Sequence, residues 1–71
     1  MRKINLRETD EYIKLGQALK AAGLVLSGVE AKDAILEGQV KVNGETELRR
    51  GRKLYDGDKI QFDGEVVIIS N

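Results

Sequence analysis

The sequence predicts an α+β fold in which two helices pack on one side of a small, mainly antiparallel sheet. Three observations predict it. Residues 3–7 alternate between polar and apolar side chains, as in a half-buried strand. Residues 12–22 and 28–37 then repeat apolar side chains at helical spacing, and short strand-like segments fill residues 40–69. A chain of 71 residues is expected to form one domain, residues 1–71.

The first predicted helix begins after Thr9 and Asp10, either of which can serve as its N-cap. Its apolar face is formed by residues at spacings of three and four: Tyr12, Leu15, Leu19 and Ala22. Gly16 weakens a helix by about 1 kcal/mol relative to alanine, so we expect a close contact at this position. Gly23 is the expected left-handed residue at the end of the helix.

The second predicted helix begins with a capping box. The Ser27 hydroxyl can accept from the amide of Glu30, and the Glu30 carboxylate can reach back to the amide of Ser27. Leu26 is placed for a hydrophobic staple with the residue after the box, and Gly38 ends the helix. Three small or apolar residues are predicted to be buried: Ala31, Ala34 and Ile35.

The remaining predicted strands are short, and turn signals separate them. They cover residues 40–42, 59–62 and 66–69, and residues 45–48 are expected to pair back on the first of these. Lys41 points away from the two valines that flank it. Asn43-Gly44 predicts a type I′ hairpin, because both residues tolerate a positive φ. Further turns are expected at residues 55–58 and 63–64.

The composition excludes several classes of function. The chain has no cysteine and no histidine, which removes disulfides, thiolate metal sites and the commonest general base. Asp56, Asp58 and Asp63 lack the spacing of a calcium loop, and the neighbouring glycines match no phosphate-binding fingerprint. We therefore predict no catalytic residues, no metal and no cofactor. The apolar runs are far shorter than the ~20 residues of a membrane span, and the sequence shows no secretory apolar segment. We therefore expect a cytoplasmic protein.

The charges sum to zero but are unevenly distributed. Twelve basic and twelve acidic residues argue against a non-specific, strongly cationic binder of nucleic acid. Arg49, Arg50, Arg52 and Lys53 are nevertheless close together, whereas acidic residues gather between 56 and 65, so two electrically different faces are expected. The basic run is either a solvated loop or a set of phosphate contacts, because arginine matches phosphate oxygens bidentately. Three scattered aromatic residues do not favour stacking of single-stranded bases.

The order of short motifs resembles a known family. Ala18-Leu19-Lys20, then Ser27-Gly28-x-Glu30-Ala31-Lys32, then Val40-Lys41-Val42-Asn43-Gly44 and Gly57-Asp58 follow one another at the spacing of the S4-type RNA-binding domain. The resemblance covers about residues 12–62. Through Arg49-Arg50-Gly51-Arg52-Lys53-Leu54, it is strongest to the small stand-alone bacterial S4-like proteins.

This resemblance implies the αL RNA-binding motif, two helices on a small sheet that grips structured RNA. The family's pattern at the start of the second helix implies RNA-facing roles for Ser27, Gly28 and Lys32, with Lys41 beside them. Gly28 stands where the family usually has an arginine. We hypothesise that the arginines at 49, 50 and 52 compensate for it.

The sequence thus predicts a non-enzymatic module that binds structured RNA, such as rRNA or tRNA, mainly through phosphate contacts. A small-molecule substrate and a membrane are not expected, and a protein partner stays open. The alternative is a protein-interaction adaptor that has the S4-like fold and has lost RNA binding. The predicted RNA-binding residues are Ser27, Gly28, Lys32, Lys41, Arg49, Arg50, Arg52 and Lys53. Replacing the four basic residues at 49–53 is expected to leave the thermal melt almost unchanged.

Overall fold

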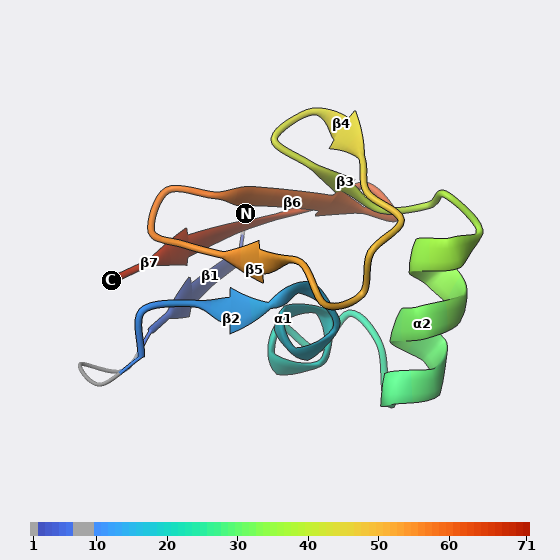
Figure 1. The fold of residues 1–71 in the computed structure, drawn as a ribbon, viewed down its shortest axis with the longest axis horizontal. Coiled ribbons are helices and arrows are strands. Elements are labelled where there is room, and N and C mark those ends of the chain that lie inside the picture. Colours follow the sequence, from blue (N-terminus) through green and yellow to red (C-terminus); the bar gives the residue numbers. More distant parts are fainter. Residues whose placement is uncertain (1, 7–9) are drawn as a thin grey trace.

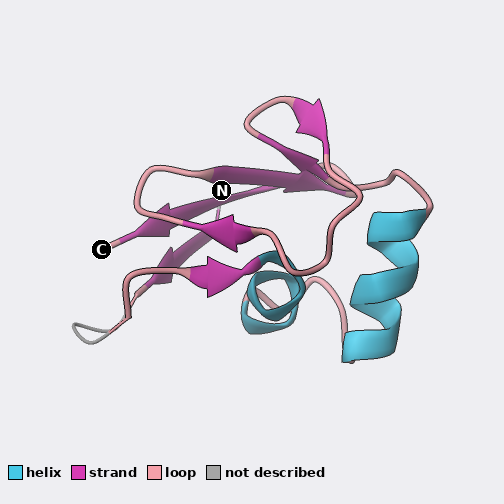
Figure 2. Cartoon of the chain, in the orientation of Figure 1, coloured by secondary structure: helices cyan, strands magenta, loops and turns pink. Residues whose placement is uncertain are grey.

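A computed structural model of the chain describes residues 2–6 and 10–71, and these form two helices and two sheets (Figures 1 and 2). The larger sheet has the strand order β1-β7-β6-β3-β4, and the smaller one pairs β2 with β5. In chain order the elements are β1 (Arg2–Asn5), β2 (Ile13–Lys14), α1 (Leu15–Ala21), α2 (Gly28–Leu36), β3 (Lys41–Val42), β4 (Glu45–Thr46), β5 (Lys53–Leu54), β6 (Lys59–Phe62) and β7 (Glu65–Ser70). The predicted α+β fold is confirmed.

The larger sheet is antiparallel except at one edge, where β1 runs parallel to β7. Two-residue turns join β3 to β4 and β6 to β7. Asn43 and Gly44 have φ angles of 52° and 88°, as the type I′ prediction requires. The predicted strand at residues 3–7 is β1, shifted toward the N-terminus, and Arg7 lies outside the described residues.

The core lies between the two helices, the larger sheet and the β2–β5 pair. In Figure 1, α1 is seen end-on below the sheet and α2 stands beside it. Each element contributes small or branched apolar side chains, and the fully buried larger ones are Leu15, Leu19, Ile35, Val40, Val42, Leu54, Ile60, Val67 and Ile69. No helix within residues 2–6 and 10–71 is long and apolar enough to cross a membrane.

The first helix begins three residues later than the sequence predicts. Ile13 and Lys14 form β2 opposite Leu54 and Lys53, so Tyr12 lies before the helix and the expected helical face starts at Leu15. The N-cap is Lys14; the prediction of Asp10 is wrong, and Thr9 lies outside the described residues. Carbonyl groups from residues 50 and 52 replace a side-chain cap by accepting from the first amides of the helix.

The second helix begins as predicted in one respect and differs in two. Ser27 Oγ accepts from the Glu30 amide at 3.2 Å, which confirms half of the capping box. The Glu30 carboxylate accepts from the amide of Leu26 at 3.3 Å, rather than from Ser27. Leu26 is 87% exposed, so the predicted staple is wrong: Ala31 is buried in the core and offers little surface for it. Burial of Ala31, Ala34 and Ile35 is confirmed.

Candidate nucleic-acid interface

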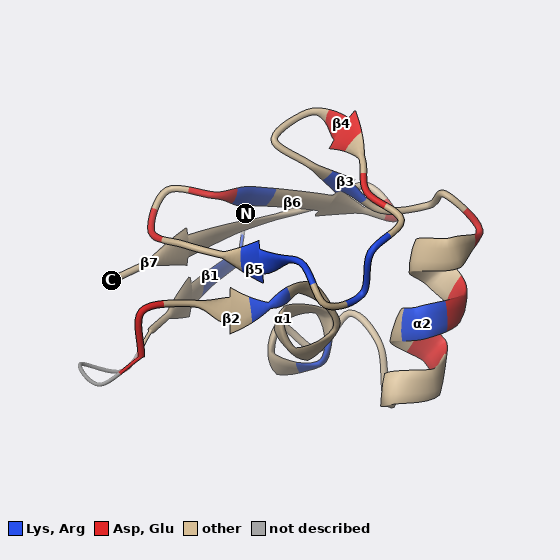
Figure 3. Ribbon diagram, in the orientation of Figure 1, with Lys and Arg blue, Asp and Glu red and all other residues tan. Residues whose placement is uncertain are grey.

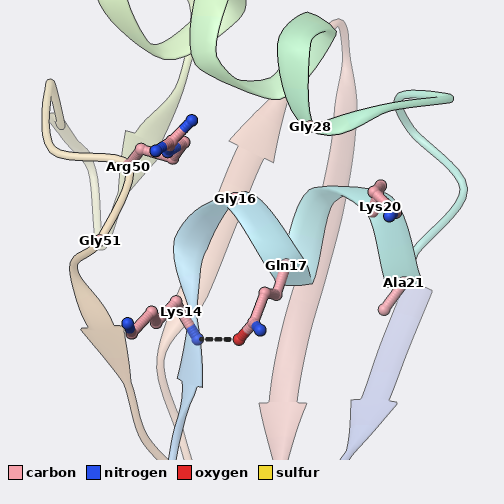
Figure 4. A pocket seen from close by; sticks show the side chains of 8 residues that line it. All are labelled: Lys14, Gly16, Gln17, Lys20, Ala21, Gly28, Arg50 and Gly51. Carbon is pink, nitrogen blue, oxygen red and sulfur yellow. Dashed lines mark hydrogen bonds between the residues drawn. The ribbon is translucent and has the colours of Figure 1, made fainter.

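A groove lies where α1, the start of α2 and the loop before β5 meet (Figure 4). Its volume is about 530 Å³. Three basic side chains line it, Lys14, Lys20 and Arg50, together with backbone at Gly28 and Gly51. We call these five residues the cationic groove. The sequence prediction included Gly28 and Arg50 and missed Lys14 and Lys20.

The groove exists because the loop before β5 lies directly on the first turn of α1. The amide of Leu15 donates to the Arg52 carbonyl at 2.9 Å, and that of Gly16 donates to the Arg50 carbonyl at 3.1 Å. These two bonds satisfy amides that a helix start otherwise leaves without partners. A Cβ on residue 16 would lie 2.7 Å from Cγ of Arg50, which is too close. The close contact predicted at Gly16 is therefore confirmed, and its partner is Arg50.

The groove concentrates positive charge that the protein does not neutralise locally. In the described part of the chain, no carboxylate lies within ion-pair distance of Lys14, Lys20 or Arg50. Lys14 also lies directly opposite Lys53 in the β2–β5 pair. Like charges at opposite positions of an antiparallel pair are destabilising, so a bound anion would relieve a repulsion that the fold tolerates.

A buried carboxylate organises the basic segment, residues 49–53. Glu47 is 6% exposed and accepts from Arg49 Nε at 3.0 Å, Arg49 Nη2 at 3.1 Å and Arg52 Nη1 at 2.8 Å. It also accepts from the Arg49 amide at 3.0 Å. The hydrogen bonds from Arg49 and Arg52 outweigh the cost of burial and lower the pKa of Glu47 from 4.5 to about 2.

Two of the predicted RNA-binding arginines thus have a structural partner that the sequence analysis missed. Glutamate in a hairpin is ordinarily solvated, and nothing in the pattern of residues 45–48 marks Glu47 as buried. Removing Arg49 and Arg52 would leave a buried charge unpaired, so the expectation of an unchanged melt for the four-residue replacement no longer holds. Arg49, Arg52 and Lys53 line a second hollow of about 590 Å³, which shares Gly51 with the cationic groove.

The other predicted residues lie at different distances from the groove. Ser27 caps α2 immediately before Gly28, the first residue of that helix. Lys32 is exposed on α2. Lys41 is exposed on β3 and lines a separate hollow that Asp63 and Glu65 also line. The structure therefore brings Gly28 together with Arg50 and leaves Lys41 apart from them.

Basic residues are concentrated in one part of the fold (Figure 3). Basic segments meet at β2, β5 and the loop between β4 and β5, whereas α2 carries several acidic residues. Acidic side chains between 56 and 58 support turns: Asp58 accepts from the Tyr55 amide at 2.7 Å and Asp56 from the Asn71 amide at 2.8 Å. Within residues 2–6 and 10–71, no three acidic groups are grouped as a metal site requires.

The fold and the groove define a small domain of the S4 class, and comparison with known proteins agrees. The model of the S4 domain family matches residues 4–70, so the chain belongs to this family. The solution structure of Escherichia coli YbcJ, described as revealing an "alfaL motif involved in RNA-binding", superimposes with a TM-score of 0.76 and 37% identity. The superposition spans all of this chain and 89% of YbcJ.

Two curated relatives extend this comparison. The Bacillus subtilis protein named "Probable ribosome maturation protein RlbA" is 50% identical over 54 residues, which are 76% of each chain. A tyrosine–tRNA ligase of Geobacter sulfurreducens is 49% identical over 45 residues, 63% of this chain and 11% of the ligase. The family match, YbcJ and RlbA confirm the predicted resemblance to small S4-like proteins and the prediction of a non-enzymatic domain.

Proposed function

We propose that this protein binds structured RNA through the cationic groove and the adjoining basic segment. The observation that carries the proposal is the convergence of Lys14, Lys20 and Arg50 on one groove without a carboxylate in ion-pair contact among the described residues. YbcJ, a relative with the same fold, is described as having a motif involved in RNA-binding. The basic side chains of the groove and the similarity to YbcJ therefore support an RNA partner independently.

Phosphate contacts supply most of the affinity in this proposal. Lys14, Lys20 and Arg50 neutralise phosphates along the groove, and the absent side chain of Gly51 lets the RNA backbone approach closely. The Ser27 cap fixes the start of α2, whose unbonded amides favour an anion. Arg49, Arg52 and Lys53 extend the contact surface past Gly51. Such a surface reads the shape of folded RNA more than its sequence.

The RNA class that we propose is rRNA or tRNA. The names of the relatives support it, since one is named a probable ribosome maturation protein and another a tyrosine–tRNA ligase. Lys32 and Lys41 stay predicted contacts: Lys32 lies one turn beyond Gly28 on α2, and Lys41 would need RNA that extends around the molecule.

The test is a direct binding titration at low ionic strength. Fluorescence anisotropy with a labelled RNA hairpin should show saturable binding, and a DNA duplex of the same sequence should bind more weakly because its grooves differ in shape. Ultraviolet absorbance of the purified protein should also reveal co-purified nucleic acid before high-salt washing. No saturable binding of RNA at low salt would overturn the proposal.

One observation favours the second candidate, a protein-interaction adaptor. Leu26, Val29 and Leu36 are large, apolar and exposed on or beside α2. Glu30, Asp33 and Glu37 lie among them in the sequence, so this surface suits a protein partner with basic and apolar side chains. Replacing Val29 and Leu36 by serine should abolish capture of such a partner and leave RNA binding intact. If the double variant loses RNA binding without unfolding, the two surfaces are not separate.

A further inference from the structure

The structure joins two aromatic side chains that lie far apart in the sequence. The rings of Tyr12 and Tyr55 have centroids 6.0 Å apart and planes inclined by 53°. The cause is the register of the short antiparallel pair, in which Ile13 opposes Leu54 and Lys14 opposes Lys53. One step further along the same register, Tyr12 opposes Tyr55. The sequence-based argument against base stacking therefore no longer holds, because two of the three aromatic residues form one cluster.

Alternation along these strands separates the core from an outer face. Leu54 is fully buried and Ile13 is packed against the core, so the residues on either side of them point outward. The outer face therefore carries Tyr12 and Lys14 on one strand, and Lys53 and Tyr55 on the other. The Lys53 ammonium nitrogen lies 4.8 Å from the centroid of the Tyr12 ring. Two tyrosines thus alternate with two lysines on one small surface.

Both tyrosines keep large accessible areas. Tyr12 is 37% exposed and Tyr55 is 48% exposed. Because Lys53 covers part of the Tyr12 ring, Tyr55 is the more accessible stacking surface. The Tyr12 ring packs against the Tyr55 ring. Lys14 belongs both to this outer face and to the cationic groove, so the two surfaces are continuous.

We propose that Tyr55, supported by Tyr12, stacks an unpaired nucleobase of the bound RNA while Lys53 and Lys14 contact its flanking phosphates. The inference rests on the proposed function and names a feature of the RNA: a bulged, looped or terminal nucleotide beside a folded segment. Aromatic rings interleaved with cations suit a nucleotide, because the rings stack on the base and the cations neutralise its phosphates. A fully paired helix offers phosphates and no accessible base face.

The experiment compares two labelled RNA hairpins with equal numbers of phosphates, one carrying a single bulged adenine and one fully paired. Wild-type protein should bind the bulged hairpin roughly tenfold more tightly, within the range that one base–aromatic stack provides. Tyr55→Leu should remove this difference, and Tyr55→Phe, which retains the ring, should preserve it. The thermal melt of each variant shows that it is folded.

A second measurement uses the wild-type protein alone. Its two tyrosines both belong to this cluster, so tyrosine ring resonances in an NMR spectrum report on this site only. Stacking of the bulged adenine should move the Tyr55 ring protons upfield, and the paired hairpin should leave them in place. Equal affinity for both hairpins with unmoved tyrosine resonances would overturn this inference and leave RNA binding standing. Failure to bind either hairpin would overturn both proposals.

Discussion

Two neighbouring regions of this domain are stabilised by different kinds of contact. Residues 27–44 are defined by local signals: the Ser27 hydroxyl caps α2, and Asn43 and Gly44 take up the positive φ angles of a hairpin turn. Residues 49–53 contain no comparable signal. They are held by contacts with residues distant in sequence, through Gly16 and Tyr12, and by the buried carboxylate of Glu47.

This difference shows that the basic segment, residues 49–53, depends for its shape on residues outside it. In residues 27–44, the helix cap uses groups within the segment, and the turn is also held by hydrogen bonds that join Asn43 to Asp58 and Lys59. In the basic segment, by contrast, Arg49 and Arg52 share one carboxylate and Arg50 requires a residue without a side chain beneath it. Substitutions at Tyr12, Gly16 or Glu47 should therefore affect the basic segment more than residues 27–44.

The largest expected effect is the loss of the buried carboxylate. Glu47→Gln should reduce the free energy of unfolding by about 3 kcal/mol at neutral pH, because a pKa lowered from 4.5 to about 2 is worth roughly that much. A carboxyl group with a lowered pKa stabilises the fold above its ordinary pKa, and this stabilisation is lost as the pH falls toward 2. Urea unfolding of both proteins across this window should show the difference shrinking as the pH falls.

Glu45→Gln is the matched control for this prediction. Glu45 is exposed on β4, two residues before Glu47 and on the same hairpin. Its replacement removes the same charge and should leave stability within about 0.5 kcal/mol of the wild type, as for most surface substitutions. A difference between Glu47→Gln and wild type that stays constant down to the lowest pH would contradict the assigned role of the carboxylate.

Gly16→Ala should have a smaller effect, and it should fall on binding more than on stability. Alanine favours the helix by about 1 kcal/mol, but its Cβ would displace the Arg50 stem from above α1. The two effects on stability oppose each other, so the melting temperature should change little. RNA affinity should fall several-fold, as measured by anisotropy. Gln61→Ala, at an exposed position on β6 outside the groove, is the control. Equal affinity for Gly16→Ala and wild type would contradict the prediction.

Gly28→Arg should have the smallest effect, and it should raise RNA affinity rather than lower it. A Cβ on residue 28 would meet no atom within 4 Å, so a side chain can extend from this position at the rim of the cationic groove. RNA affinity should rise a few-fold, and the salt dependence should steepen by about 0.9, the value for one more phosphate contact. Gly28→Ala should leave both quantities unchanged. Unchanged affinity and an unchanged salt slope for Gly28→Arg would show that RNA does not approach this rim.

Much of the fold could be predicted because local chemistry determines it. The helix cap at Ser27, the buried positions of α2 and the Asn43-Gly44 turn each depend on a few adjacent residues. The β2–β5 pair could not be predicted in the same way, since two-residue strands are too short to show a period. Tyr12 continued the helical pattern instead, because it lies three residues before Leu15.

The candidate site was less predictable, because it is assembled from separate segments. Lys14 and Lys20 are single basic residues that nothing in the sequence connects with Arg50. Gly16 was the available signal: a glycine inside a helix indicated a close neighbour, and that neighbour forms the groove. No pattern identified Glu47, whose burial depends on two arginines folding back over it.

The salt dependence of RNA binding tests the central claim most directly. Lys14→Ala/Lys20→Ala removes two charges from the groove, and Lys3→Ala/Lys59→Ala removes two exposed charges from outside it. In a plot of log affinity against log salt, the groove variant should have a slope shallower than the wild type by about 1.8, at roughly 0.9 per phosphate. The control variant should match the wild type. Equal slopes for all three proteins, or a flatter slope for the control alone, would contradict binding through the groove.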